Sequence, residues 1–222
     1  MTETSHIPPI IGESNLPEGA QRILVGAAEV FARKGFAAAS VRQLAEASKM
    51  SIPMMYYYFD SKDAVFQALL NLAMVYMDQH VMQPAMAADS ALESLRIFIK
   101  GHVQMALANP LVVRTLMATF FGPEEGAPSI DMFKEEHHQV LMGWIMSLVP
   151  RLGKLREGFT PLFVAMLIDD MHHSLVMAVR HLNDPKFEPF KPMLEERLSD
   201  ASIDRHIQFL LLGAFEEIYD EF

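Results

Sequence analysis

Residues 40–62 read SVRQLAEASKMSIPMMYYYFDSK, and this stretch decides the fold of the chain. Ser40 is a good N-cap, and Gln43 three residues later completes a capping box, in which each side chain bonds the other residue's backbone N–H. The pair predicts a short helix over residues 40–47. A helix of this length is not stable alone in water, so it must dock on a neighbouring segment.

The neighbouring segment follows directly after a tight turn at residues 48–50. Ser51 can cap a second helix, and Pro53 is accepted in its first turn, so the sequence predicts a helix over residues 51–58. Two short helices joined by such a turn are typical of a helix-turn-helix, whose second helix lies in the major groove of DNA.

A longer helix over residues 17–34 precedes this pair and stops at Gly35, a residue that accepts the left-handed conformation common at helix ends. Together these segments closely resemble the DNA-binding domain of TetR/AcrR-type transcriptional regulators, over about residues 17–70. Their spacing and residue types agree throughout. The stretches that carry the resemblance are AAEVFARKGF at 27–36, SVRQLA at 40–45 and MYYYFDSKDA at 55–64.

The resemblance implies an all-α fold, with an N-terminal three-helix helix-turn-helix domain on a larger helical ligand-binding and dimerisation domain. It also implies a homodimeric, ligand-responsive repressor that a small apolar effector releases from its double-stranded DNA operator. We therefore expect a flexible arm at residues 1–15, a helix-turn-helix domain at 16–62, and a ligand-binding and dimerisation domain at 63–222.

The remainder of the chain matches the family in length and helical character only. Its prolines mark the gaps into which helices fit, and the apolar residues between them recur at spacings of three and four. No segment alternates as half-buried strands do, and residues 183–198 read as a long connection. The predicted helices cover residues 61–83, 89–108, 110–121, 129–149, 159–182 and 199–220.

The resemblance also assigns roles to the aromatic run at the end of the second short helix. It implies that Tyr56 and Phe59 pack inside the domain. It implies that Tyr57 and Tyr58 face DNA, and their hydroxyl groups favour this over a fully buried aromatic cluster, because tyrosine usually keeps its polar end wet. Lys62 resembles the family's phosphate-contacting lysine, and the alternative is an ordinary solvated lysine.

Ser40 and Arg42 lie beside the same phosphate backbone in this interpretation, and Ser40 caps its helix in either case. Two features depart from the family. Lys49 replaces the usual glycine of the turn, where a left-handed lysine costs on the order of 1 kcal/mol. The recognition helix opens without the usual lysine, glycine and threonine, and its apolar side chains can touch thymine methyls but donate no hydrogen bond. The expected DNA-binding residues are Ser40, Arg42, Ile52, Pro53, Met54, Tyr57, Tyr58 and Lys62.

Charge separates the chain into two parts. The net charge is −10, yet residues 17–63 hold six basic and five acidic groups, while residues 71–222 hold 12 basic and 21 acidic groups. A near-neutral module on an acidic body indicates two different tasks. The chain has no cysteine, and it lacks a phosphate-binding glycine loop, a nucleophile elbow and an HExxH motif. We therefore expect no enzyme activity, no cofactor and no metal.

The acidic body is rich in methionine, phenylalanine and leucine, most of which a packed core explains. A subset can line an adaptable apolar pocket for the effector. The negative charge of the body favours an apolar or mildly basic ligand. The candidate lining residues are Phe98, His102, Met105, Trp144, Met166, Asp169 and His173.

Two polar clusters interrupt this body, at residues 135–138 and 169–173. Each places a carboxylate and a histidine three residues apart on one helix face, which is the spacing of two-metal sites in helix bundles. The alternative function is therefore a metal-dependent helix-bundle enzyme. Solvated charge explains the first cluster without a metal, and a satisfied pair of Asp169 with His173 explains the second.

Apolar residues at helical spacing along residues 199–220 predict that this helix and 159–182 pair with their copies in a four-helix dimer interface. Neither a targeting signal nor an apolar stretch of about 18 residues is visible. We therefore expect a cytoplasmic homodimer with no membrane contact.

Overall fold

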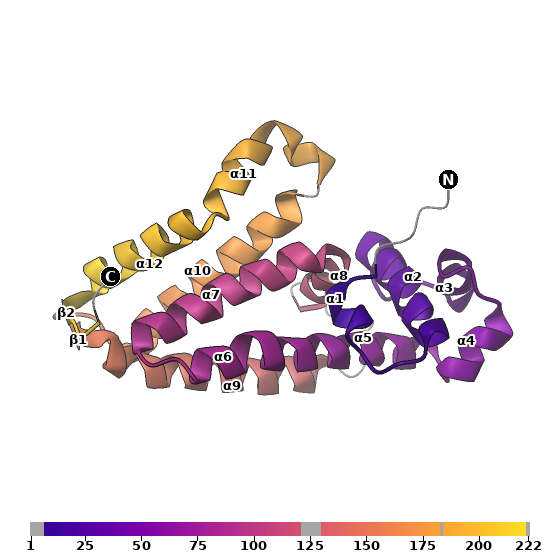
Figure 1. Cartoon of the computed structure of the whole chain (residues 1–222), viewed down its shortest axis with the longest axis horizontal. Coiled ribbons are helices and arrows are strands. Elements are labelled where there is room, and N and C mark those ends of the chain that lie inside the picture. The colour runs from indigo at the N-terminus through magenta and orange to yellow at the C-terminus, as the bar shows by residue number, and fades with distance from the viewer. Residues whose placement is uncertain (1–6, 121–129, 183, 221–222) are drawn as a thin grey trace. The chain divides into compact units, whose positions relative to one another are not determined.

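The computed structural model describes residues 7–120, 130–182 and 184–220. The chain divides into two compact units, whose helices and strands are labelled in Figure 1. The first unit comprises residues 1–76 and 108–131, and the second unit comprises residues 77–107 and 132–222.

The described part of the first unit is helical, and the three helices predicted for residues 17–34, 40–47 and 51–58 are confirmed to within one residue at each end. A fourth helix, which is long, follows them directly, and a further helix from later in the chain also belongs to this unit. The helices of this unit are α1 (Pro9–Gly12), α2 (Glu18–Lys34), α3 (Val41–Ala47), α4 (Ile52–Tyr58), α5 (Lys62–Met77) and α8 (Pro110–Phe120).

Both capping predictions for the short helices are confirmed. At α3, the Ser40 hydroxyl accepts a hydrogen bond from the Gln43 backbone N–H at 3.3 Å, and the Gln43 side-chain oxygen Oε1 accepts one from the Ser40 backbone N–H at 3.1 Å. At α4, the Ser51 hydroxyl accepts from the Met54 N–H at 3.3 Å. These bonds satisfy N–H groups that the first turn of a helix leaves without an intrahelical partner.

The turn between α3 and α4 depends on two special backbone positions. Lys49 adopts a φ of 55°, which is the left-handed conformation expected where a lysine replaces glycine. Gly26 of α2 lies directly against the turn, because a Cβ there would come within 2.5 Å of the Ser48 nitrogen. The close approach of α2 therefore helps to fix the turn that orients α4.

Aromatic rings join the long helices of the first unit. The ring of Phe66 on α5 meets the ring of Phe31 on α2 at a centroid distance of 5.5 Å and that of Phe36 at 5.0 Å, both edge to face. Buried aromatic pairs in this geometry add to the stabilisation from burial alone. The helix that follows the helix-turn-helix is thus anchored in the same core.

The expected flexible arm differs from the structure over its second half. The short helix α1 buries Ile10 and Ile11, and the Ile10 N–H donates to the Asn109 side-chain oxygen at 2.9 Å. Asn109 is itself fully buried just before α8. These contacts span nearly a hundred positions of sequence, which is why local composition did not predict them. Residues 1–6 lie outside the described part of the chain.

The second unit is built mainly from long helices. The helix predicted for residues 61–83 continues through a π-helical segment, and the other predictions are confirmed in outline, with shifted ends. The elements of this unit are η1 (Asp78–Met82), α6 (Gln83–Met86), α7 (Ala91–Ala108), α9 (Ile130–Leu152), β1 (Gly153–Leu155), α10 (Pro161–Leu182), η2 (Pro185–Phe190), α11 (Lys191–Arg197), α12 (Asp200–Ala214) and β2 (Phe215–Ile218).

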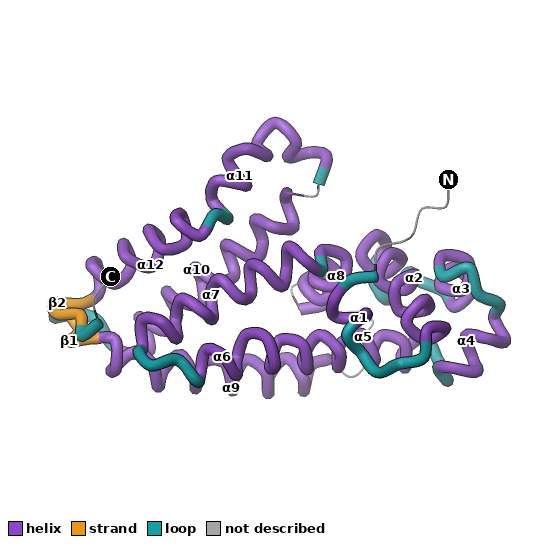
Figure 2. The backbone as a smooth tube through the Cα atoms, viewed as in Figure 1, coloured by secondary structure: helices purple, strands orange, loops and turns teal. Residues whose placement is uncertain are grey.

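Two short strands correct the expectation of a chain without strands. β1 and β2 pair antiparallel, with Gly153 opposite Ile218, as Figure 2 shows in orange. The predicted helix over 199–220 therefore ends at Ala214. A Cβ on Gly153 would overlap the Glu217 carbonyl oxygen, so the strand pair needs glycine there. Strands of three and four residues are too short to show an alternating pattern.

The connection expected at residues 183–198 contains helical turns, η2 and α11, and Leu194 of α11 is buried. Its neighbour α10 is, within the described residues, the helix that is long and apolar enough to cross a membrane. The sequence analysis had found no apolar stretch of that length. Such a helix is weak evidence of a membrane, because core helices pass the same test. α10 also carries Asp169, Asp170, His172 and His173.

Candidate DNA-binding surface and polar–aromatic cluster

The helix α4 exposes almost every side chain it carries. Met55 is its buried residue, whereas Ile52, Met54 and the tyrosines are accessible, with Tyr57 76% exposed. A helix of seven residues that buries a single side chain contributes little to a core. Its outward apolar and aromatic residues are therefore available to a partner.

The aromatic run at the end of α4 lies differently from expectation at one position. Tyr56 was expected to pack, but it is 52% exposed, because the buried position belongs to Met55. Phe59 is half-buried, as is Tyr58. The Tyr58 ring lies so close to Gly19 of α2 that a Cβ there would come within 2.5 Å of the hydroxyl oxygen.

Lys62 has a structural contact that the sequence did not indicate. Its ammonium group donates to the carbonyl oxygens of Phe36 at 2.9 Å and Ala39 at 3.0 Å, and lies 4.1 Å from the centroid of the Phe36 ring. It therefore holds the loop between α2 and α3 in place. An ammonium has three donors, so these two bonds leave one N–H for a phosphate.

The N-terminal end of α3 carries the other expected phosphate contacts. Ser40 and Arg42 are both exposed there. The Ser40 hydroxyl is already engaged with Gln43 as a cap. Arg42 presents an exposed guanidinium group, whose donors match the geometry of a phosphate.

In the second unit, the structure brings five expected ligand-binding residues and one unexpected residue together. The Phe98 ring of α7 is fully buried and meets the rings of His102 at 4.5 Å, Trp144 of α9 at 4.8 Å and His172 of α10 at 5.0 Å, measured between centroids. Asp169 and His173 adjoin His172 on α10. We call this set the polar–aromatic cluster: Phe98, His102, Trp144, Asp169, His172 and His173.

His172 is the member that the sequence analysis missed. It is buried, and its ring lies 4.4 Å from that of His102. A signal for it existed, because Ile168 and Leu175 flank it at spacings of four and three on the buried stripe of α10. A histidine on such a stripe is expected to face the core.

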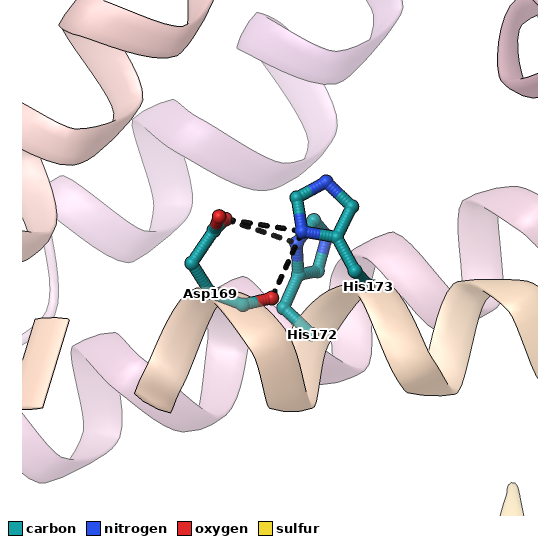
Figure 3. Close-up of side chains that lie close together, drawn as sticks. All are labelled: Asp169, His172 and His173. Atoms are coloured by element: carbon teal, nitrogen blue, oxygen red, sulfur yellow. Dashed lines mark hydrogen bonds and ion pairs between the residues drawn. The ribbon is translucent and has the colours of Figure 1, made fainter. Parts of the chain in front are cut away.

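The expected pair of Asp169 with His173 is present (Figure 3). The His173 Nδ1 lies 3.3 Å from the Asp169 Oδ1 and 3.0 Å from the Asp169 carbonyl oxygen. The hydrogen bond to the Asp169 carboxylate raises the pKa of His173 above its usual value, against the opposing effect of burial. The His172 Nδ1 lies 4.0 Å from the same carboxylate oxygen.

Two other predicted ligand-binding residues, Met166 and Met105, are not part of this cluster. Met166 is 50% exposed, beside the exposed Leu162 and Phe163 in the first turns of α10, so it does not share the burial of the cluster. Met105 is half-buried on α7, one turn beyond His102. The side chains of residues 135–137 lie outside the described part of the structure, and His138 is exposed.

Comparison with known proteins agrees with this arrangement. Residues 23–69 match the family model of the bacterial regulatory proteins, tetR family. The chain is similar to the ketosteroid transcriptional regulator KstR2 of Mycobacterium tuberculosis, with a TM-score of 0.71 and 16% identity over 91% of this chain and 98% of that one. The search among curated proteins found no match.

Two further solved structures share the fold. The fatty acid degradation regulator FadR from Bacillus halodurans gives a TM-score of 0.57 and 14% identity, over 83% of this chain and 96% of that one. AibR, solved in complex with isovaleryl coenzyme A and operator DNA, gives a TM-score of 0.63 and 15% identity, over 88% of this chain and 97% of that one.

The match of residues 23–69 to a family of bacterial regulatory proteins favours a transcriptional regulator over the helix-bundle enzyme. The family model covers the helix-turn-helix with its exposed α4, and the likeness to solved regulators extends the shared fold through the second unit. The helix-turn-helix region of the chain, residues 23–69, thus matches the tetR family of bacterial regulatory proteins, and the chain as a whole shares the fold of solved regulators.

Proposed function

We propose that the chain is a homodimeric repressor, which an effector bound at the polar–aromatic cluster releases from a two-fold symmetric operator. The exposure of α4 is the observation that carries the DNA-binding part. Ile52 and Met54 would contact thymine methyls in the major groove, while Arg42, Tyr57, Tyr58 and Lys62 would contact phosphates.

The dimer part rests on an exposed apolar face of the second unit. Phe209 is 84% exposed on α12, and Leu212 follows it one turn later. The adjoining helix α10 exposes Leu162, Phe163 and Met166. Large apolar side chains gathered on two neighbouring helices are a common mark of a protein interface. A two-fold pairing of both helices would form a four-helix bundle.

The effector part rests on the composition of the cluster. Aromatic faces at Phe98 and Trp144 suit an apolar or cationic group. Asp169 can pair with a basic ligand in place of His173. Binding would favour an arrangement of the two DNA-binding domains that does not match successive major grooves. One protein of the same fold, AibR, was solved in complex with isovaleryl coenzyme A and operator DNA, which supports a small-molecule effector here.

Selection of DNA from a random pool by the full-length protein, with footprinting of the winner, tests the DNA-binding part. We expect two symmetric half-sites whose centres lie about 10–10.5 bp, or a multiple of this, apart. Failure to enrich any sequence, or enrichment of an asymmetric site, would contradict the proposal. A regulator of this kind acts where the chromosome is, so we place it in the cytoplasm.

A thermal-shift screen of small molecules tests the effector part. A true effector at about a hundred times its dissociation constant stabilises the protein by about 2.7 kcal/mol and releases the selected DNA. We expect Asp169→Asn and His173→Ala to reduce that response. The assignment is wrong if strongly anionic compounds alone stabilise the protein and release DNA, and neither substitution changes their effect.

A further inference from the structure

We propose that Asp169, His172 and His173 form a binding site for one divalent transition-metal ion of the zinc class. The three residues occupy positions i, i+3 and i+4 of α10, which places them on one face of the helix over successive turns. Figure 3 shows both imidazole rings standing beside the Asp169 carboxylate. The site depends on this geometry and not on DNA binding.

The distances suit a small cation. One ligand atom from each residue lies within 4.8 Å of the other two. The Asp169 Oδ1 is 3.3 Å from the His173 Nδ1 and 4.0 Å from the His172 Nδ1. Tetrahedral zinc, with bonds of about 2.0–2.2 Å, separates its ligand atoms by about 3.3–3.6 Å. Small side-chain rotations therefore bring all three atoms into range while α10 keeps its backbone.

The chemistry of the donors selects the class of metal. Two imidazole nitrogens with one carboxylate oxygen are a ligand set of zinc and of cobalt, nickel and copper in the same oxidation state. Calcium and magnesium instead prefer shells made of oxygen. Three protein ligands also leave a fourth position open, as in zinc sites that bind water or a small molecule.

The surroundings of the three residues support a bound cation. The side chains of Asp169 and His172 are 13% and 8% exposed, so water screens the carboxylate only weakly. The buried Phe98 ring lies against His172 and supports its orientation. The His102 Nδ1 donates to the Phe98 carbonyl oxygen at 2.8 Å, which fixes that ring beside His172. Neighbours that fix the orientation of a ligating ring, as these two do for His172, raise metal affinity.

Another histidine of the second unit provides an internal comparison. His206 on α12 also has its Nδ1 against the carbonyl oxygen of the residue four positions earlier, Ser202, at 2.7 Å. Within the described residues, the three residues of α10 are the group of histidine and carboxylate side chains that converge closely enough to hold a metal. His206 is therefore a matched control for His173, because both histidines place Nδ1 against the carbonyl oxygen four residues earlier, but His206 is not part of this group.

Titration of chelator-treated, full-length protein with Co²⁺ tests the proposal, because cobalt in a site of three protein ligands gives visible absorption bands. We expect the wild-type protein to saturate at one Co²⁺ per chain, and Zn²⁺ to bleach the bands by displacement. Asp169→Asn and His173→Gln should each weaken binding by more than about 100-fold, since even groups outside a ligand set alter affinity by 10–100-fold.

His206→Gln should titrate like the wild-type protein. Far-UV circular dichroism and melting without metal will show that the variants are folded. The proposal is overturned if the wild-type protein develops no bands, or if Asp169→Asn and His173→Gln bind Co²⁺ as tightly as His206→Gln does. A protein that binds Co²⁺ but selects no DNA would contradict the proposed repressor function and leave this site standing.

Discussion

The two units of the chain differ in the distance along the sequence over which their functional residues are brought together. In the first unit, the residues that cap the two short helices of the helix-turn-helix lie close together, and Ser40 and Gln43 cap α3 from three positions apart. In the second unit, Phe98, Trp144 and His172 meet from three separate helices. A DNA-binding surface can thus be specified locally, whereas the candidate effector site depends on tertiary packing.

The largest expected effect tests how closely the first unit is packed. Gly26→Ala places a Cβ within 2.8 Å of three backbone atoms of Ala47 and Ser48, which cannot move aside as a flexible side chain would. We expect a loss of about 3 kcal/mol in the free energy of unfolding, measured by chemical denaturation, together with loss of DNA binding.

The matched control for this change lies in the second unit. Among the described residues, a Cβ at Gly143 of α9 would meet no atom within 4 Å beyond its own helix backbone and chain neighbours, so Gly143→Ala should raise stability by about 0.5–1 kcal/mol through helix propensity. If both alanine variants changed the free energy of unfolding equally and only slightly, the turn beside Gly26 would tolerate movement. The proposed difference in packing between the two glycine sites would then be wrong.

The next effect concerns the exposed face of α12. Phe209→Glu should raise the dimer dissociation constant by about 100-fold or more, because an unpaired carboxylate in a buried interface costs several kcal/mol. Sedimentation at micromolar concentration checks this, with the exposed Val140→Glu of α9 as control. A wild-type monomer that binds DNA fully would refute the dimer.

Lys62→Met separates the two roles of Lys62. Methionine keeps the apolar stem over Phe36 but loses both bonds to the loop carbonyl oxygens, so we expect a loss of about 2 kcal/mol of stability. If the third N–H also contacts a phosphate, the slope of log affinity against log salt falls by about one. Lys34→Met, in the last turn of α2, is the control for charge alone. An unchanged slope would leave Lys62 as a purely structural residue.

The smallest effect comes from one hydroxyl group. Tyr58→Phe keeps the ring that packs against Gly19 and should weaken operator binding by about 1 kcal/mol, or roughly fivefold, with unchanged melting. Fluorescence anisotropy with labelled DNA can resolve this. Tyr219→Phe in the second unit should have no effect, and an equal response of both variants would argue against a DNA contact at Tyr58.

The same contrast explains which features the sequence could predict. The caps at Ser40 and Ser51 follow from local rules, whereas the left-handed Lys49 followed from the resemblance to the family, and all three are present. The pairing of Ile10 with Asn109 and of β1 with β2 joins segments far apart in the chain, so no local pattern indicates it.

The candidate sites follow this division as well. His173 beside Asp169 was predictable because their spacing of four places both on one helix face. The tertiary bonds of Lys62 were not, because a lysine at a helix start carries no mark of the carbonyl oxygens it will meet. The exposure of Tyr56 was also missed, since the neighbouring Met55 serves equally well as the buried residue.

The central claim is that α4 reads the bases of the operator. The most direct measurement repeats the selection from a random DNA pool with Met54→Gln, which replaces an exposed apolar side chain by one that can bond adenine with both its donor and its acceptor. The account predicts that the winning sequence shifts toward adenine at one position in each half-site, with an unchanged salt slope. Selection of the wild-type sequence by the variant, with unchanged affinity, would contradict it.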